Sequence, residues 1–311
     1  MDYYDILKSS SSKSYITKYP SSSDTRFNDG MLTPETSPTF RLDFKNKPRV
    51  FTIGSCFARN IEEALEPFGV ILPTKAFESP PEERPYTRAN ALLNEYNPGS
   101  MSQKILSALN GRKAPVETII QSGELFYDLL LPAAPGVAYE RAVARRDEID
   151  DVYTSLADAD CVIITLGFIE AWYDHATEHW LNRFPPIPST KERHRFSLKV
   201  LDVDESMRLL SEAIDALNTT GKKVLLTVSP VPMVRTFTNR DCVIANDFSK
   251  SVLRVCADRL CANFSNVDYF PSYEMIKSLG SRAFKSDNVH VKEKFVEKVT
   301  GHMLKTYQSE T

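Results

Sequence analysis

Short runs of apolar residues recur along the chain, separated by segments in which apolar residues recur every three or four positions. The runs are too short for helices and too continuous for strands with one wet face, which is typical of parallel strands covered on both sides. They occupy residues 50–53, 70–72, 161–166, 224–228 and 267–270. We therefore predict a mainly parallel sheet.

The helical spacing follows several of these runs. It predicts helices near 57–65, 207–217, 248–260 and 291–303. In the third of these the apolar stripe consists of Phe248, Val252, Val255, Cys256 and Leu260. Strands that alternate with helices pack the helices on both faces of the sheet, so the predicted fold class is α/β, a three-layer α/β/α sandwich.

Two segments interrupt this alternation. Residues 73–158 carry several prolines and helical stretches near 87–96, 100–110 and 143–157, which predicts a helical insertion. Residues 1–48 are rich in serine and poor in apolar residues, which predicts a flexible N-terminal arm whose end Phe40, Leu42 and Phe44 could attach to the body; plain disorder is the alternative. Residues 49–311 are then expected to form one domain.

Composition narrows the class of protein. The 311 residues carry a formal net charge of −3, which gives no electrostatic reason to expect nucleic acid as a partner. No apolar run approaches the roughly 20 residues that cross a bilayer, and the first residues do not resemble a secretory signal, so we expect a cytoplasmic protein without a membrane partner. The five cysteines show no CxxC spacing, and we expect no disulfide scaffold or zinc site.

Polar residues with chemical potential follow the predicted strands, where the carboxyl ends of a parallel sheet place ligands. Gly54, Ser55 and Cys56 follow the first strand. A cysteine at the start of a helix has a stabilised thiolate, and the backbone N–H groups there can bind an oxyanion. Ser55 is the other candidate nucleophile, and a tight turn without chemistry is the alternative to both.

Asp287 and His290 form a D-x-x-H pair before the last predicted helix. An aspartate three residues upstream can hold the imidazole in one tautomer and raise its basicity, although a helix cap beside a surface histidine would give the same pattern.

Two weaker signals involve other loops. Asn97 and Gly99 lie in an N-P-G-S turn; they could donate to an oxyanion, or Asn97 could simply cap a helix. His175, Glu178 and His179 lie close together, but they lack the spacing of a known zinc motif, so we expect no metal.

The residues from Gly54 to Ala58 spell GSCFA, and the chain resembles the GSCFA family, which is similar to a branch of the SGNH/GDSL hydrolases. The resemblance covers residues 49 to 305. It also includes TLGFIEAWYD from Thr165, SPVP from Ser229, YFPSYE from Tyr269, NPGS from Asn97 and the D-x-x-H pair.

The resemblance implies site roles. The Gly-Asp-Ser of the superfamily matches Gly54-Ser55-Cys56, which puts Cys56 at the nucleophile position and leaves Ser55 as the alternative one residue away. The Gly-x-Asn-Asp segment matches residues 167–170, so Gly167 is retained, Ile169 replaces the oxyanion asparagine, and Glu170 could orient a substrate. The D-x-x-H pair supplies the base, His290, and its orienting Asp287.

The function expected from these residues is ester or thioester hydrolysis, or acyl transfer, by a Cys/Ser–His–Asp arrangement. Bacterial members of the family resemble proteins linked to polysaccharide modification, so a glycan or a small hydroxylated molecule is the expected acceptor. We expect no cofactor, although an acyl-CoA thioester could serve as co-substrate. The rival expectation is a non-catalytic ligand- or glycan-binding module on the same scaffold.

Overall fold

The computed structural model describes residues 2, 18–21, 23–186, 192 and 194–309. Residues 1, 3–17 and 22 of the predicted serine-rich arm lie outside the described residues, so the flexibility of that part stays a prediction. Four parallel strands form the central sheet in the order β11-β10-β6-β3. Their bounds are β3 Val50–Gly54, β6 Cys161–Leu166, β10 Lys223–Val228 and β11 Val267–Tyr269. The predicted α/β class and four of the five predicted strands are confirmed.

The predicted strand at 70–72 is wrong. Ile71 forms only a single parallel bridge with Arg49. Gly69, with φ of +69°, ends the turn before it, and Pro73 begins a helix directly after it. Because proline has no N–H for a sheet ladder, the segment is too short to extend the pairing.

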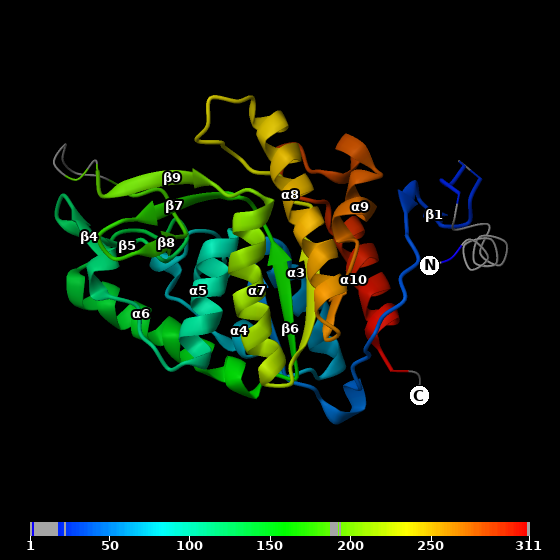
Figure 1. Cartoon of the computed structure of the whole chain (residues 1–311), viewed down its shortest axis with the longest axis horizontal. Helices are drawn as coiled ribbons and strands as arrows, with labels where there is room; N and C mark the ends of the chain where they lie inside the picture. Colours follow the sequence, from blue (N-terminus) through cyan, green and yellow to red (C-terminus); the bar gives the residue numbers. More distant parts are fainter. Residues whose placement is uncertain (1, 3–17, 22, 187–191, 193, 310–311) are drawn as a thin grey trace.

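Helices cover both faces of the sheet, as predicted (Figure 1). On one face Val50, Cys161 and Ile163 pack against α3 Cys56–Leu65, α9 Ser272–Lys277 and α10 Glu293–Tyr307. The side chains between them, such as Phe51 and Val162, point to the other face and its helices. Those helices are α5 Pro98–Leu109, α6 Tyr139–Thr154, α7 Val203–Thr219 and α8 Cys242–Asn263.

The segment 73–158 is less helical than predicted. It holds α5 and α6 near two of the expected positions, the short α4 Pro73–Ala76, and a hairpin of β4 Ile119–Ser122 and β5 Leu125–Asp128. The predicted helix at 87–96 is wrong: only the 3-10 turn Ala91–Leu93 forms, because the chain then extends along the end of β3.

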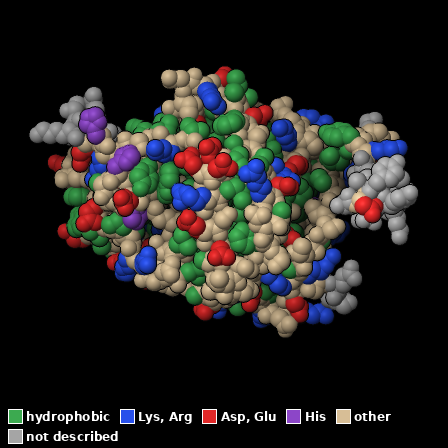
Figure 2. All heavy atoms as spheres, in the orientation of Figure 1, with side chains coloured by type: hydrophobic (Ala, Val, Ile, Leu, Met, Phe, Trp, Pro, Cys, Tyr) green, Lys and Arg blue, Asp and Glu red, His purple; other side chains and the backbone are tan. Residues whose placement is uncertain are grey.

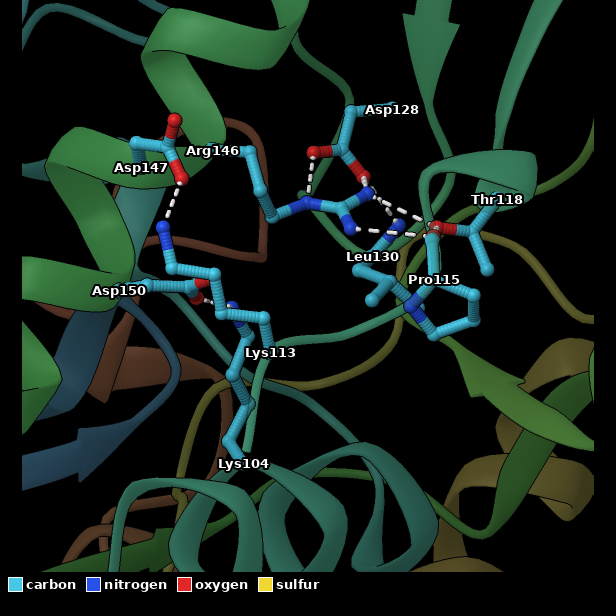
Figure 3. A network of polar contacts seen from close by, with 9 residues as sticks. All are labelled: Lys104, Lys113, Pro115, Thr118, Asp128, Leu130, Arg146, Asp147 and Asp150. Atoms are coloured by element: carbon cyan, nitrogen blue, oxygen red, sulfur yellow. Dashed lines mark hydrogen bonds and ion pairs between the residues drawn. The ribbon is translucent and has the colours of Figure 1, made fainter. Parts of the chain in front are cut away.

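Buried polar contacts fasten α6 to this hairpin (Figure 3). The Arg146 guanidinium forms an ion pair with Asp128 and donates to the Thr118 hydroxyl at 2.9 Å. Asp128 Oδ1 also accepts a hydrogen bond from the Leu130 N–H at 2.9 Å. Nearer the surface, Lys113 pairs with Asp147 at 2.6 Å. These contacts fix the outer end of the insertion.

A second, antiparallel sheet was not predicted. It consists of β7 Glu170–Asp174, β8 His179–Leu181 and β9 Phe196–Val200, in the order β8-β7-β9. Three residues separate the end of β6 from the start of β7, and Ala171 joins the apolar core of the α5–α8 face. The second sheet therefore lies past the carboxyl end of β6.

The remaining elements are short. A hairpin joins β1 Phe27–Asn28 to β2 Met31–Leu32. In the described segments, 3-10 turns also form at Phe44–Asn46, Glu66–Phe68, Pro81–Glu83, Val116–Thr118, Ser155–Asp158 and Gly280–Ala283. Basic and acidic side chains are interspersed over the face shown in Figure 2. In the described part of the chain, no helix has the length and apolarity to cross a bilayer.

Candidate active site

The turn from β3 into α3 is closely packed at the carboxyl edge of the sheet. Gly54 pairs in register with Thr165 of β6 and has a φ of +143°, which side chains rarely adopt. A Cβ at this position would lie 2.5 Å from the Thr165 carbonyl oxygen. Glycine is therefore required here for steric reasons, and it lets α3 begin immediately above the sheet.

Ser55 is used by the fold. Its side chain is buried, caps α3 by accepting from the Phe57 N–H at 3.4 Å, and donates to the Ser229 hydroxyl at 3.0 Å. A hydroxyl held in this way is a helix cap rather than a group turned toward solvent. Of the two predicted nucleophiles, Cys56 is the one left accessible.

Cys56 is the first residue of α3, and its thiol is free and partly exposed. Burial raises the pKa of the thiol, whereas the charges of Arg88, Lys250 and Arg59 and a backbone hydrogen bond act in the opposite direction. Removal of water and stabilisation of the anion thus compete at this sulfur.

The cations around Cys56 come from three parts of the chain. Arg88 donates to the Cys56 carbonyl oxygen at 3.4 Å and to the Asn60 side chain at 2.5 Å. Arg59 is buried and pairs with Glu62 of the same helix at 2.6 Å. Lys250, from α8, is fully buried. An anion formed at this end of α3 would face positive charge as well as the positive end of the helix dipole.

Residues 94–97 run along the end of β3 and tie it to the end of β6. The Glu95 N–H donates to the Gly54 carbonyl at 2.9 Å, and the Phe168 N–H donates to the Tyr96 carbonyl at 2.7 Å. A Cβ at Gly167 would lie 2.6 Å from that Tyr96 oxygen. Gly167 is therefore needed for close backbone approach, and the Tyr96 and Phe168 rings stack at 5.8 Å.

Asn97 and Gly99 have structural roles. The Asn97 side-chain oxygen accepts from the Ser100 N–H at 2.9 Å, and its amide donates to the Leu181 carbonyl at 3.1 Å. A Cβ on Gly99 would collide with the Trp180 ring at 2.4 Å. The capping interpretation of this turn is confirmed, and neither residue is turned toward Cys56 by these contacts.

Asp287 and His290 form the expected pair. Asp287 Oδ2 lies 2.6 Å from His290 Nδ1, and its other oxygen accepts from the N–H groups of Val289 and His290. These hydrogen bonds, the one to His290 first, lower the pKa of the Asp287 carboxyl. The side chains are 46% and 61% exposed.

The fold places this pair at the same edge as Cys56. The far end of α10 lies near the start of β10, because Arg41 donates to the Thr306 carbonyl and accepts from Lys223 at 3.0 Å. His290, just before α10, is therefore at the carboxyl edge, on the face that α3 and α10 share. In the described structure, however, no hydrogen bond joins His290 to Cys56 or Ser55, so the predicted base and nucleophile are near the same edge but not hydrogen-bonded.

Glu170 lines a separate pocket of about 300 Å³ with Ile169, Val200, Thr238, Asn239, Arg240 and Ala245. Its carboxylate accepts from the Phe237 N–H at 2.8 Å and the Thr236 hydroxyl at 2.5 Å. Glu170 thus holds the loop whose residues 238–240 line this pocket. Ile169, which replaces the expected asparagine, is buried in the core.

The two histidines of the HATEH stretch serve the second sheet. His175 Nε2 lies 2.9 Å from the Ser197 hydroxyl, and His179 Nδ1 lies 2.5 Å from the Thr177 carbonyl. Within the described residues, no three His, Cys, Asp or Glu side chains are grouped closely enough to hold a metal ion.

Several ionisable residues of this region were missed from the sequence. Lys250 lies three, seven and ten positions before Leu253, Ala257 and Leu260, which are all buried, so it shares their face of α8, but spacing alone does not mark a lysine for burial. Glu95 is buried beside the sheet edge, and burial raises its pKa to about 7. No pattern in the sequence singles out Glu95, because it lies in an irregular segment.

The fold and the site define an α/β protein with a Gly-Ser-Cys turn at the carboxyl end of β3, a strand of the central parallel sheet. The model of the GSCFA family matches residues 49–303, and the chain belongs to that family. Comparison with curated proteins gives no match.

Among solved structures, the chain is similar to a mutant of Axe2, an acetyl-xylooligosaccharide esterase from Geobacillus Stearmophilus. The two are 17% identical, with a TM-score of 0.34 over 85% of this chain and 95% of that one. Nothing in the site rests on this similarity.

Proposed function

We propose that this protein catalyses acyl-group chemistry, either ester or thioester hydrolysis or acyl transfer, with Cys56 as the nucleophile. The observation that carries the proposal is the position of Cys56: a free, partly exposed thiol on the first residue of α3, at the carboxyl edge, within the electrostatic reach of Arg88, Lys250 and Arg59. A free catalytic thiol also suits the expected cytoplasmic location, because reducing conditions keep it unpaired.

In the proposed reaction the Cys56 thiolate adds to the acyl carbonyl. The oxyanion that develops is stabilised by the N-terminal end of α3 and by the nearby positive charge. The intermediate collapses to a Cys56 thioester as the leaving alcohol or thiol departs with a proton. Water or a hydroxylated acceptor then attacks the thioester, which regenerates the thiol and releases an acid or a new ester.

We assign the Asp287–His290 pair to the second half of this reaction. Its exposure leaves the imidazole free to take a proton from water or from an acceptor hydroxyl that enters from solvent. The hydrogen bond from His290 to Asp287 would hold the tautomer whose Nε2 can accept that proton. The family resemblance supports a glycan or another small hydroxylated acceptor.

The test is turnover of acyl-nitrophenyl esters and acyl-CoA by the full chain. We expect Cys56→Ala to lose at least about 10²-fold in kcat/KM, and Ser55→Ala to lose stability more than activity. Cys242→Ala is the matched control, since Cys242 is also a partly exposed thiol on the first residue of a helix. Equal activity of the parent and Cys56→Ala would refute the nucleophile assignment.

A non-catalytic binding module is the second candidate. It is favoured by the raised pKa of the Cys56 thiol and by the lack of a hydrogen bond between His290 and that thiol in the described structure. The same assay separates the two, because a binding module would turn over neither substrate in any variant.

A further inference from the structure

Lys250 is the one fully buried lysine of the described chain, and it has no carboxylate partner there. Its Nζ donates to the Gly167 carbonyl oxygen at 2.8 Å and lies 4.9 Å from the centre of the Phe168 ring. Its neighbour Ser249 accepts from the Ile169 N–H at 3.0 Å. A buried ammonium without a counter-ion is costly, so this position needs an explanation beyond packing.

The register of the sheet brings this amine and Cys56 to the same sheet edge. Gly54 and Thr165 are paired across β3 and β6, and each strand runs parallel to the other. Cys56 follows Gly54 by two residues, and Gly167 follows Thr165 by two residues. The carbonyl that Lys250 binds and Cys56 therefore both lie just past the carboxyl ends of two adjacent strands.

Arg59, Arg88 and Tyr96 are the other ionisable groups that interact with Cys56. Arg59 belongs to α3 itself, and Arg88 approaches from the loop before residues 91–93. Tyr96, which interacts with Tyr86 and Asn94, approaches from the segment along β3, and burial raises its pKa well above the usual value. A guanidinium has no acceptor atom, which leaves Lys250 as the group among these that can accept a proton.

The electrostatics agree with that role. Burial lowers the pKa of Lys250 to about 7, and the nearby Cys56 sulfur opposes this shift. An amine in this range is partly unprotonated at neutral pH and can act as a base.

We propose that Lys250, rather than His290, is the catalytic residue that accepts the thiol proton of Cys56. The inference rests on the proposed function, of which it supplies the first step. It divides the proton transfers between two bases at one sheet edge: the buried Lys250 for the nucleophile and the exposed His290 for the acceptor.

In this first half of the reaction one proton moves from Cys56 to Lys250 and then to the leaving group. The Cys56 S–H bond breaks and the proton passes to the neutral Lys250 amine, giving thiolate and ammonium. The thiolate forms the C–S bond of the acyl-enzyme, and the Lys250 ammonium returns the proton to the departing alkoxide or thiolate. Both residues then have the protonation states with which the second half of the reaction begins.

The test is the alkylation rate of Cys56 by iodoacetamide as a function of pH, followed by peptide mass analysis of the full chain. Lys250→Met removes the amine and keeps an apolar stem; we expect Cys56 alkylation at pH 7 to slow by about tenfold or more, with its pH midpoint displaced upward by at least about one unit. Lys222→Met is the matched control, since Lys222 is also buried and donates to carbonyls, of Ala157 and Ala159, at the other edge of the sheet. We expect Lys222→Met and His290→Ala to leave the midpoint unchanged.

Lys250→Arg separates a base from a structural clamp. Arginine keeps the charge and can donate to Gly167, so the thiol should stay reactive toward iodoacetamide, while turnover falls at least about 10²-fold because guanidinium accepts no proton at this pH. Should Lys250→Met not fold, this variant carries the test. Full turnover by Lys250→Arg, or an unchanged midpoint in folded Lys250→Met, would overturn the proposal.

Alkylation needs no substrate, so the two proposals fail separately. A midpoint that depends on Lys250 in a protein that forms no acyl adduct would support the Lys250–Cys56 pair and refute the proposed function. An adduct on Cys56 with a midpoint independent of Lys250 would do the reverse.

Discussion

At the scale of single residues, two buried ionisable side chains near the sheet edge have pKa values displaced to about 7. Lys250 is held by a carbonyl and an aromatic ring. Glu95 is buried with Oε2 lacking a hydrogen-bond partner among the described residues, and the charge of Lys104 and a bond from Ser100 only partly offset the burial. Both groups therefore change protonation state in the physiological range.

Glu95 gives a prediction about stability and pH. Its folded pKa of about 7 exceeds the ordinary 4.5, so the folded protein holds an extra proton between these values and its free energy of unfolding falls as the pH rises. The free energy of unfolding of the wild type, minus that of Glu95→Gln, should fall by about 2 to 3 kcal/mol from pH 5 to pH 8. Urea denaturation at several pH values measures it. The exposed Glu124→Gln is the control, and a difference independent of pH would show that Glu95 is ionised throughout.

At the scale of elements, apolar runs and helical spacing located the inner strands and the helices that cover them. The spacing misplaced part of α8: Phe248 and Val255 are each 42% exposed, while Ser249 and Lys250 are buried. Polar residues occupy the inward positions there because they bind the backbone of residues 167–169, a tertiary contact that local spacing cannot reveal.

The same limit explains the second sheet. Its strands contain polar residues such as His179, Asp174 and Glu170, so their composition is not that of a buried strand. β7 pairs with both β8 and β9, and the ion pair between Asp174 of β7 and Arg195, just before β9, joins two of these strands. Of the site, the turn at Cys56 and the Asp287–His290 pair were predictable from motifs, whereas Lys250 and Glu95 depended on the packing.

The start of α5 tests the role of Asn97. Asn97→Ala should lower the free energy of unfolding by about 1 to 2 kcal/mol, since it removes the cap of α5 and the donor to Leu181. Asn97→Ser, which keeps a capping oxygen, should recover part of the loss. Activity of the folded variants should be retained. Loss of activity in a stable Asn97→Ser protein would instead identify Asn97 as an oxyanion donor.

At the scale of the whole molecule, the sheet has one apolar core on each face, and residues before the family match take part in one of them. Leu42 and Phe44 are buried among α3 and α10 side chains. Leu42 also donates to the Tyr307 carbonyl at 2.7 Å and accepts from Ser309 at 3.0 Å. The described segment near residue 42 thus packs with the end of the chain, while the family model begins at residue 49.

Leu42→Ala tests whether this packing belongs to the cooperative unit. The free energy of unfolding should fall by about 2 to 4 kcal/mol, the usual cost of truncating a buried leucine. Tyr19→Ala, at a residue that is 94% exposed, is the control and should change little. A loss below about 0.5 kcal/mol for Leu42→Ala would show that the segment is not part of the folded unit.

The central claim is that Cys56 carries the acyl group. The most direct measurement is the intact mass of the full chain after exposure to a panel of acyl thioesters, followed by peptide mapping of any adduct. The account predicts a mass increase of one acyl group on the peptide that contains Cys56, absent in Cys56→Ala and present in Cys242→Ala. An adduct on Ser55 or on another cysteine, or an equal adduct in Cys56→Ala, would contradict it.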